Sequence, residues 1–349
     1  MTDFSQIHQP VLLERCVELI APALQQPNAV AVDCTLGLAG HTIAFLKAAP
    51  LATVIGIDRD AEALGKASER IAQEGLADRF VPVHAAFDEF DQVLAEQGID
   101  QVQAVFMDLG LSSLQIDERE RGFSYAHDAP LDMRMDVSQT LTAQDVLATY
   151  DVDQLTRIFK EYGEERFARP IAKRIVHERD QQPLTTSAQL TELVDEVIPR
   201  SKRSGGNPAK RVFQALRIEV NGELDKLART LPQIALHLAV GGHLAVESYH
   251  SLEDRTVKNF MAKGLRVDAP ADMPVVAPDM QPFFKALVKG AVKADEQEIA
   301  HNPRSASVRL RAVELVRPVP QRWRKAFEEE SREVVRTQHA RHHSHARRG

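Results

Sequence analysis

The stretch VDCTLGLAGHT, residues 32–42, decides the fold, because it joins a short apolar run to a segment with helical spacing. The run AVAVDCTLG (29–37) is rich in β-branched residues and ends in a turn, as a buried strand does. Residues 40–49 then predict a helix, and the N-terminus of a helix offers free N–H groups to a ligand. The stretch is therefore typical of the first strand–turn–helix unit of a parallel sheet.

Further strand-like and helix-like segments alternate around this unit. A helix is predicted before it, over residues 11–24, and an amphipathic helix after it, over residues 61–75. Three more predicted strands are ATVIGIDRD (52–60), RFVPVHAAF (79–87) and QAVFMDLG (103–110). Strands that alternate with helices of this length imply an α/β fold, in which a parallel sheet is covered on both faces.

The alternation stops after the fourth strand, where a charged and largely helical stretch follows. Strands are predicted again in GGHLAVESYH and RSASVRLRAVEL. We therefore expect one α/β domain, interrupted by an all-helical insertion that recognises the substrate and followed by an Arg/His-rich mobile tail with at most one helix. The expected bounds are 1–113 and 207–316 for the two parts of the α/β domain, 114–206 for the insertion and 317–349 for the tail.

Composition excludes several classes of protein. The 349 residues are 44% hydrophobic and 27% charged, which excludes global disorder, and the net charge of -7 is not typical of a nucleic-acid binder. Two cysteines, Cys16 and Cys34, cannot build a disulfide framework or a zinc site, and they suit a reducing compartment. No signal peptide and no bilayer-long apolar run is recognisable, so we expect a cytoplasmic protein without a membrane segment.

The turn and an acid further along the chain indicate a cofactor with a free ribose. Asp58 ends the second predicted strand, where its carboxylate can accept both ribose hydroxyls. Leu38 and Ala39 occupy places where a pyrophosphate would favour glycine, which weakens a dinucleotide interpretation. S-adenosylmethionine, which has no phosphates, fits this pattern. An NAD-dependent oxidoreductase is the rival enzyme, and a structural turn with a surface Asp is the alternative without a ligand.

Other residues lie where predicted strands end, at the edge where ligands bind in parallel sheets. They are Asp33, Phe87, Asp108 and the segment ESYHS (247–251). Phe87 is placed to stack on an adenine, with core packing as the alternative. Asp108 serves the cofactor or the substrate, or caps a helix. Cys34 lacks the Pro-Cys loop of a cytosine-C5 methyltransferase nucleophile, so we expect a small buried residue.

Several longer stretches, in chain order, resemble one known family. They are HQPVLLE (8–14), DCTLGLAGHT (33–42), IDRD (57–60), MDLGLSSLQID (107–117), RGFSY…PLDMRMD (121–136), YGEERFARPIAKRIV (162–176), FQALRIEVNGEL (213–224), SYHSLEDRTVKNF (248–260) and NPRSASVRLR (302–311). Together they resemble the bacterial 16S ribosomal RNA cytosine-N4 methyltransferase family (RsmH/MraW). The resemblance implies a class I methyltransferase fold, Rossmann-like and mostly parallel, with a helical insertion. It also implies S-adenosyl-L-methionine as methyl donor.

The resemblance carries a set of cofactor residues onto this chain. The implied contacts to S-adenosylmethionine are Ala39, Gly40, His41, Asp58, Phe87, Asp108 and Gln115. The family often has glycine where Ala39 stands, and many members have phenylalanine where Tyr249 stands. An alanine at position 39 is acceptable if its backbone N–H makes the contact to the cofactor. A tyrosine at position 249 retains the aromatic ring.

The implied substrate is a cytidine of 16S rRNA at the decoding centre, the P site, of the small ribosomal subunit. Its N4 amine is a poor nucleophile, because the lone pair is delocalised into the ring. A hydrogen-bond acceptor can localise that lone pair and take a proton after transfer. The motif that commonly does this in amino-methyltransferases is replaced here by DLGLSS. Asp108 is our first candidate acceptor and His250 our second.

The base must leave its stack to react, so an aromatic or apolar pocket should receive it. Candidate pocket and phosphate contacts are Phe123, Tyr125, Tyr249, Arg134, Arg255 and Arg304. Core packing and structural ion pairs are the alternatives. The insertion would form the other wall of an RNA cleft. A non-catalytic assembly or RNA-binding factor that keeps the cofactor pocket is the rival outside enzymes, and a homo-oligomer stays open.

Overall fold

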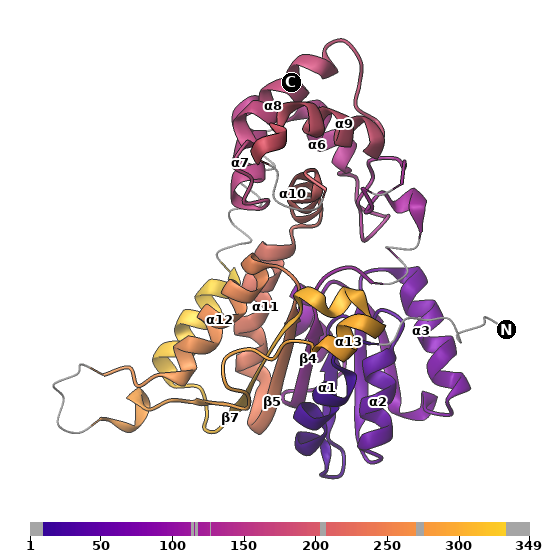
Figure 1. The fold of residues 1–349 in the computed structure, drawn as a ribbon. Coiled ribbons are helices and arrows are strands. Elements are labelled where there is room, and N and C mark those ends of the chain that lie inside the picture. The colour runs from indigo at the N-terminus through magenta and orange to yellow at the C-terminus, as the bar shows by residue number, and fades with distance from the viewer. Residues whose placement is uncertain are drawn as a thin grey trace. The chain divides into compact units, whose positions relative to one another are not determined.

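The computed structural model describes residues 10–112, 115, 118–125, 127–202, 207–269 and 276–332. The chain forms two compact units (Figure 1). The first, Met1–Gly110 with Leu224–Gly349, is called the sheet unit, and the second, Leu111–Glu223, is called the helical unit. Buried apolar clusters lie within each of them.

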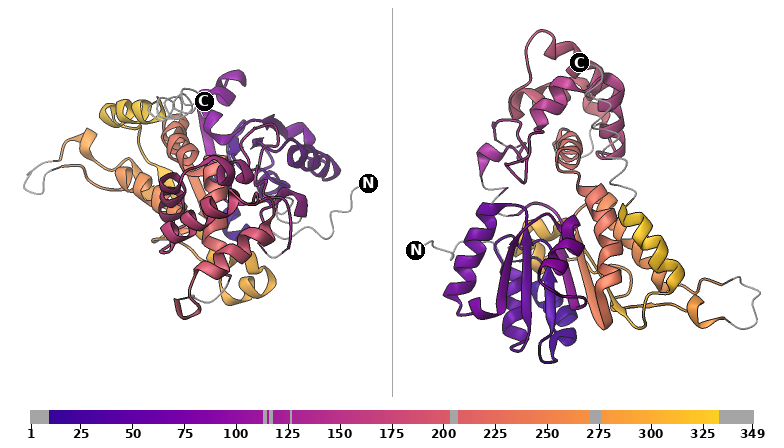
Figure 2. Two further views of the ribbon diagram at one scale, coloured as in Figure 1. Left: turned by 90° about the horizontal axis from the view of Figure 1, so that it is seen from above. Right: turned by 180° about the vertical axis from the view of Figure 1, so that it is seen from behind.

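The sheet unit is built on seven strands in the order β3-β2-β1-β4-β5-β7-β6. Neighbours from β3 to β5 run parallel, whereas β7 is antiparallel to β5 and to β6. The parallel strands are visible side by side in the right panel of Figure 2. Their bounds are β1 Val30–Asp33, β2 Thr53–Asp58, β3 Phe80–His84, β4 Val102–Asp108, β5 Leu238–Ser248, β6 Phe284–Ala286 and β7 Arg309–Leu315. The predicted α/β class with a mostly parallel sheet is confirmed.

Helices cover both faces of this sheet, as the pattern indicated. One apolar core packs α1 (Leu13–Ile20), α2 (Gly40–Ala48) and α3 (Ala61–Gln73) against the strands. The other packs α4 (Phe90–Glu96), α11 (Glu223–His237) and α12 (Ser251–Leu265). Shorter elements are η1 Ala21–Leu24, η2 Ala77–Arg79, η3 Phe87–Glu89, η6 Pro278–Met280, α13 Glu296–His301 and η7 Pro303–Ser307. Across the described ranges, no helix has the length and apolar character that a bilayer crossing requires.

The expected mobile tail, 317–349, needs a correction. Residues 321–332 form a helix that lies beside α12, drawn in yellow in Figures 1 and 2. Phe327 is fully buried, with its ring centroid 5.3 Å from that of Phe260 and 5.7 Å from that of Trp323. The burial of an aromatic ring of this size stabilises the docked helix. This part of the expected tail is therefore integral to the sheet unit.

The helical unit consists of helices with side-chain caps. Thr142, Asp151 and Thr186 each accept a backbone N–H at a helix start, which satisfies donors that have no partner within the helix. The helices are α6 Ala143–Thr149, α7 Val152–Glu161, α8 Ala168–Arg179, α9 Ser187–Val197 and α10 Lys210–Asn221, with η4 Arg119–Arg121 and η5 Arg200–Lys202.

Helix α10 belongs to the helical unit, whereas we expected it in the second part of the α/β domain. Its residues Val212, Phe213 and Leu216 are buried in the core that α6 to α9 share. The insertion therefore ends after α10 rather than before it, because its apolar side chains complete the core of the helical unit.

Candidate active site

The chain turns sharply between β1 and α2. Gly37 and Ala39 have φ values of 51° and 61°, in the left-handed region. A left-handed conformation costs an alanine about 1 kcal/mol, which explains why glycine is the usual residue at such a position. Ala39 is the residue before α2, and its own N–H donates to the carbonyl of Leu36 at 2.8 Å. The strained turn exposes the start of α2 to the end of the sheet.

Gly40, the first residue of α2, is required by a contact inside the protein. A Cβ at this position would lie 2.3 Å from Cγ of Pro10, which is closer than real side chains approach. The proline ring therefore occupies the space of the missing side chain. This contact explains the glycine without a ligand, and its implied cofactor role stays a prediction.

Asp58 is tied to the turn by its carboxylate. Its Oδ2 accepts a hydrogen bond from the backbone N–H of Gly37 at 2.8 Å, and its Oδ1 accepts one from that of Asp60 at 2.9 Å. Each carboxylate oxygen has a second lone pair, so both can still accept from a hydroxyl. Burial raises the pKa of Asp58 to about 6. The acid and the turn form one rigid element at the end of β2.

Asp108 lies at the end of β4, two strands from Asp58 in the sheet order. Its Oδ1 accepts a hydrogen bond from the hydroxyl of Tyr249 at 2.7 Å, and its N–H donates to Oγ1 of Thr35 at 2.6 Å. Burial raises the pKa of Asp108 to about 6, and the Tyr249 hydrogen bond opposes that rise. A fixed carboxylate that binds a proton near neutral pH meets the needs of a general base.

Asp33 ends β1, which lies between β2 and β4. Its Oδ2 accepts from Oγ1 of Thr42 at 2.7 Å and its Oδ1 from the N–H of Thr35 at 3.1 Å. Burial raises the pKa of Asp33 to about 6 as well. Asp33 is only 2% exposed, whereas the Asp108 side chain is 29% exposed. Only Asp108 of these two can therefore meet a substrate without rearrangement.

The end of the sheet is acidic and lacks basic partners. Asp33, Asp58 and Asp108 form no ion pair with an Arg or Lys side chain within the ranges that the structure describes. Three carboxyl groups that form no ion pair with Arg or Lys favour a positively charged ligand, although the nearby charge of Arg59 lowers the pKa of Asp58. They disfavour the pyrophosphate of a dinucleotide, because negative charges close together repel.

The predicted cofactor residues His41 and Phe87 have contacts within the protein. His41 Nε2 donates to the carbonyl of Val11 at 2.9 Å, its Nδ1 lies 4.0 Å from Oδ2 of Asp108, and burial lowers its pKa. His41 is therefore neutral. Phe87 begins η3 and packs, half-buried, against the core of α4, α11 and α12, which is the alternative role that we considered. The adenine contact stays a prediction.

His250, the second candidate acceptor, caps helix α12. Its Nδ1 accepts from the N–H of Glu253 at 3.4 Å, and its Nε2 lies 3.0 Å from Oε1 of the same residue. The other oxygen of Glu253 accepts from the N–H of Tyr249 at 2.8 Å. Nδ1 is thus engaged at the start of α12 and Nε2 is buried beside Glu253, which favours Asp108 over His250 as the acceptor.

The basic candidates of the sheet unit are Arg255 and Arg304. Arg255 is exposed on α12 and Arg304 is half-buried in η7. Both side chains interact with other groups of the protein. Their predicted contacts to RNA stay predictions.

Three substrate candidates in the helical unit have structural roles. Phe123 is buried in its core, and the ring of Tyr125 lies edge-on to that of Phe213 with centroids 5.9 Å apart. Arg134 grips Asp132 with two hydrogen bonds, from Nε to Oδ1 at 2.9 Å and from Nη2 to Oδ2 at 2.7 Å. Its Nη1 donates to two backbone carbonyls. Core packing and a structural ion pair, the alternatives that we considered, are what the structure contains.

Gln115, the remaining predicted cofactor residue, belongs to the helical unit. It is buried, its Oε1 accepts from the N–H of Ser112, and its own N–H donates to Oγ of Ser112, both at 3.2 Å. These paired bonds resemble those of a helix cap. The contact to the cofactor stays a prediction.

The sequence analysis placed Glu247 at the ligand-binding edge, within ESYHS, without a specific role; it lies beside Asp108 in the register of β4 and β5. Glu247 is fully buried, and its Oε1 accepts from Sγ of Cys16 at 3.4 Å. Burial raises its pKa well above the ordinary range, and the charge of Asp108 adds to the rise. The signal was present in the sequence as an acid inside the apolar strand LAVES.

Comparison with known proteins shows the family to which the chain belongs. Residues 5–316 match the MraW methylase family. The chain is 77% identical over 353 residues to "Ribosomal RNA small subunit methyltransferase H" of Bifidobacterium animalis subsp. lactis, with 100% of both chains covered. It is 55% identical over 311 residues to the protein of the same name from Clavibacter michiganensis, covering 89% of this chain and 97% of that relative. The solved structure of an rRNA methylase from Streptococcus thermophilus matches with a TM-score of 0.37 and 13% identity, over 87% of this chain and 94% of the other. The resemblance seen in the sequence is confirmed, and the chain belongs to the MraW methylase family.

Proposed function

We propose that this protein is an S-adenosylmethionine-dependent methyltransferase that acts on the N4 amine of a cytidine in 16S rRNA. The match to the methylase family over residues 5–316 supports the enzyme class, and the names of its relatives support ribosomal RNA of the small subunit as substrate. We place the reaction in the cytoplasm, on the decoding centre. The observation that carries the proposal is the acidic end of the sheet, where none of the three aspartates forms an ion pair with an Arg or Lys side chain among the described residues, beside the left-handed turn.

The turn and Asp58 fit the adenosyl part of the methyl donor. Asp58 is held by the N–H of Gly37, and its remaining lone pairs are suited to two ribose hydroxyls. The surrounding carboxyl groups favour a cationic sulfonium over an anionic ligand. When bound, the donor supplies an electrophilic methyl group. The proposal retains the contacts to S-adenosylmethionine that the family resemblance implies for Ala39, Gly40, His41, Phe87 and Gln115.

Asp108 is the residue that we assign to the acceptor amine. Tyr249 donates to Oδ1 and thereby fixes the carboxyl group, Oδ2 lies 4.0 Å from Nδ1 of the neutral His41, and the carboxyl group of Glu247 also hydrogen-bonds to Asp108. A carboxylate that accepts a hydrogen bond from the amine localises the nitrogen lone pair. With a pKa of about 6, Asp108 is ionised at neutral pH and still able to take the proton that the amine loses.

Contacts to the RNA backbone are assigned to the sheet unit. Arg255 and Arg304 of the sheet unit offer cationic groups for phosphates, which position RNA without reading its sequence. Phe123, Tyr125 and Arg134 hold their places in the helical unit through intramolecular contacts, so we assign them to shaping that unit rather than to a first contact with the base.

The test is methyl transfer to small ribosomal subunits from a strain that lacks the modification, with isotope-labelled S-adenosylmethionine. We expect N4-methylcytidine in the digested 16S rRNA, identified by mass spectrometry, and its loss with Asp108→Asn. Glu219→Gln is the matched control, because Glu219 also accepts from a tyrosine hydroxyl at 2.7 Å.

Two outcomes would contradict the proposal. Donor binding without methyl transfer by the intact protein would leave a non-catalytic assembly factor. Binding of NAD in place of S-adenosylmethionine would favour the oxidoreductase.

A further inference from the structure

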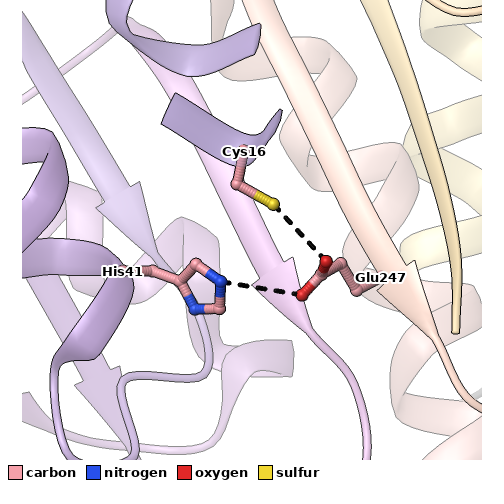
Figure 3. A group of neighbouring side chains, drawn as sticks. All are labelled: Cys16, His41 and Glu247. Carbon is pink, nitrogen blue, oxygen red and sulfur yellow. Dashed lines mark hydrogen bonds and ion pairs between the residues drawn. The ribbon is translucent and has the colours of Figure 1, made fainter. Parts of the chain in front are cut away.

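Glu247 is a fully buried acid beside the candidate active site, at the end of β5. Its carboxyl group lies between Cys16 of α1 and His41 of α2 (Figure 3). Asp108 is its neighbour across the parallel pair of β4 and β5. Methyl transfer as proposed above gives Glu247 no role of its own, so an acid buried at this position calls for an explanation.

The surroundings of Glu247 supply no positive charge. Its carboxyl group forms no ion pair with an Arg or Lys side chain in the part of the chain that the structure describes. Nε2 of the neutral His41 lies 3.8 Å from Oε2 of Glu247, but it donates to the carbonyl of Val11 instead. An unpaired carboxylate in a buried position is costly, so burial favours the neutral, protonated acid.

A protonated Glu247 has one hydrogen bond to donate, and Asp108 is its acceptor. Oε1 of Glu247 accepts from Sγ of Cys16 at 3.4 Å, whereas no donor among the described residues reaches Oε2. The carboxyl group can therefore carry a proton of its own. The hydrogen bond between the two acids raises the pKa of Glu247 and lowers that of Asp108. Both directions place the shared proton on Glu247.

We propose that protonated Glu247 is a positioning residue, which donates a hydrogen bond to Asp108 and holds it as the ionised acceptor for methyl transfer. The catalytic part of this inference rests on the proposed function, whereas the hydrogen bond does not. Tyr249, the residue after β5, donates to Oδ1 of Asp108 at 2.7 Å. Two neutral donors from the end of one strand thus orient the carboxylate without an arginine. A hydrogen bond to the charged form stabilises that form.

The proton balance of the two acids follows from their exposure. Before the reaction, Glu247 holds one proton and Asp108 holds none. When the acceptor amine loses its proton to Asp108, the two acids hold two protons and no net charge. The Asp108 side chain is 29% exposed, whereas that of Glu247 is fully buried. Asp108 therefore returns the proton to solvent, and Glu247 keeps its own.

Other titratable groups face the two acids from the surrounding elements. They are Asp33 of β1, Cys16 of α1, His41 of α2, Tyr249 after β5, Glu253 of α12 and Glu298 of α13. None of these six is a cation near neutral pH, because burial lowers the pKa of His41. The negative charge of Glu298 raises the pKa of Glu247, and that of Glu253 raises the pKa of Asp108. The pKa of Asp108 is still only about 6, so Asp108 is the acid that ionises first.

Infrared spectroscopy of the full-length protein tests where the proton lies. A protonated carboxylic acid has a C=O stretch that a carboxylate lacks, and isotope labelling of the glutamate carboxyl groups separates it from aspartate. At a pH well above 6, we expect a labelled acid band that is absent from Glu247→Gln. Glu223→Gln is the matched control, because the buried Glu223 accepts two hydrogen bonds from Arg217, and it should leave this band unchanged.

The pH profile of kcat tests the effect on Asp108. In the unmodified protein, kcat should fall as pH decreases through about 6, the pKa of Asp108. Glu247→Leu removes the donor, so this acid limb should move to higher pH by about one unit. Glu247→Gln retains a donor in its amide group and should restore the position of the limb. Circular dichroism shows whether each variant is folded.

Three outcomes would overturn the inference. They are the absence of a labelled acid band, an acid limb that Glu247→Leu leaves in place, and a limb that Glu247→Gln moves to lower pH. The last would show that Glu247 carries the charge and Asp108 the proton. An acid band that Glu247→Gln removes, in a protein that transfers no methyl group, would instead contradict the proposed function and support the hydrogen bond.

Discussion

Each unit contains a tyrosine whose hydroxyl donates to a carboxylate at 2.7 Å, and the two pairs differ in their neighbours. In the helical unit, Glu219 accepts from Tyr150 and also has a guanidinium nitrogen of Arg157 at 3.5 Å. In the sheet unit, Asp108 accepts from Tyr249, and no basic side chain among the described residues forms an ion pair with it except His41, which is neutral. The same hydrogen bond therefore belongs to a neutralised pair in one unit and to an available base in the other.

The contrast extends to other acids of the two units. Asp132 and Glu223 of the helical unit are each gripped by an arginine through two hydrogen bonds. Asp33 and Asp58 at the strand ends are held by hydroxyl and backbone N–H groups, which orient a carboxylate without cancelling its charge. Orientation without neutralisation is the property on which we base the proposal that the chemistry takes place in the sheet unit.

The largest effect is expected from the two tyrosine-bound acids. Asp108→Asn should lower kcat for methyl transfer about 100-fold to 10,000-fold, since it removes the general base. Glu219→Gln should leave kcat within about threefold, because Glu219 lies beside the guanidinium group of Arg157 and therefore does not act as a free base. Both are measured with labelled donor and small ribosomal subunits. Equal losses of kcat in the two variants would contradict the assignment of Asp108, and not Glu219, as the general base.

A large effect on stability is expected at the docked C-terminal helix. Phe327→Ala should lower the free energy of unfolding by about 3–5 kcal/mol, because it leaves a cavity among Phe260, Phe283 and Trp323. The exposed Glu329→Ala is the control and should stay within about 0.5 kcal/mol. Urea unfolding measures both. A change below 1 kcal/mol for Phe327→Ala would show that this helix does not stabilise the sheet unit.

An intermediate effect is expected for Asp58, at the end of β2. Asp58→Ala should weaken binding of S-adenosylmethionine by about 1–3 kcal/mol, because a hydrogen bond to a charged acceptor is lost. Asp78→Ala, an exposed acid in η2, should not change the affinity. Calorimetry compares the two. An affinity that Asp58→Ala leaves unchanged would exclude this carboxylate from the site.

The smallest effect concerns pH. The pKa of Asp33 is raised to about 6 in the folded protein, from an ordinary value near 3.8, because the group is buried. The folded state therefore binds a proton more tightly than the unfolded state, so Asp33 adds stability as pH falls through 6. Between pH 7.5 and 5.5 this gain is about 0.8 kcal/mol.

Asp33→Asn should remove that gain. Its free energy of unfolding is expected to rise less over the same pH interval than that of the unmodified protein, as measured by urea unfolding at each pH. If the free energy of unfolding rose more steeply in the variant as pH falls, protonation of Asp33 would destabilise the folded state, contrary to our assignment.

Much of the catalytic end was predictable because it follows from local pattern and one topological rule. Asp33, Asp58 and Asp108 each end an apolar run, and parallel strands end at one edge of a sheet, so their gathering there could be inferred. What each carboxylate bonds to was not predictable. The capping role of His250 and the grip of Arg134 on Asp132 depend on side-chain contacts that no spacing rule specifies.

Three features were missed because they depend on packing over a distance. Helix α10 has an amphipathic pattern that fits either core, and only the folded chain shows which core it completes. The spacing of four between Trp323 and Phe327 marks one helix face, but charged residues around it suggested a tail. The meeting of Cys16 with Glu247 requires α1 and β5, which are far apart in the chain, to come together.

The contact between Pro10 and Gly40 makes the beginning of the chain a mechanical part of the catalytic end. The proline ring fills the place of a side chain at the first residue of α2, so a pull on the segment ahead of α1 would be transmitted to the turn that precedes this helix. An affinity tag fused ahead of Pro10 would therefore act on the contact between Pro10 and Gly40. A tag at the opposite end of the chain would not act on this contact. Comparing the two fusions would show how far the proposed donor site depends on the contact between Pro10 and Gly40.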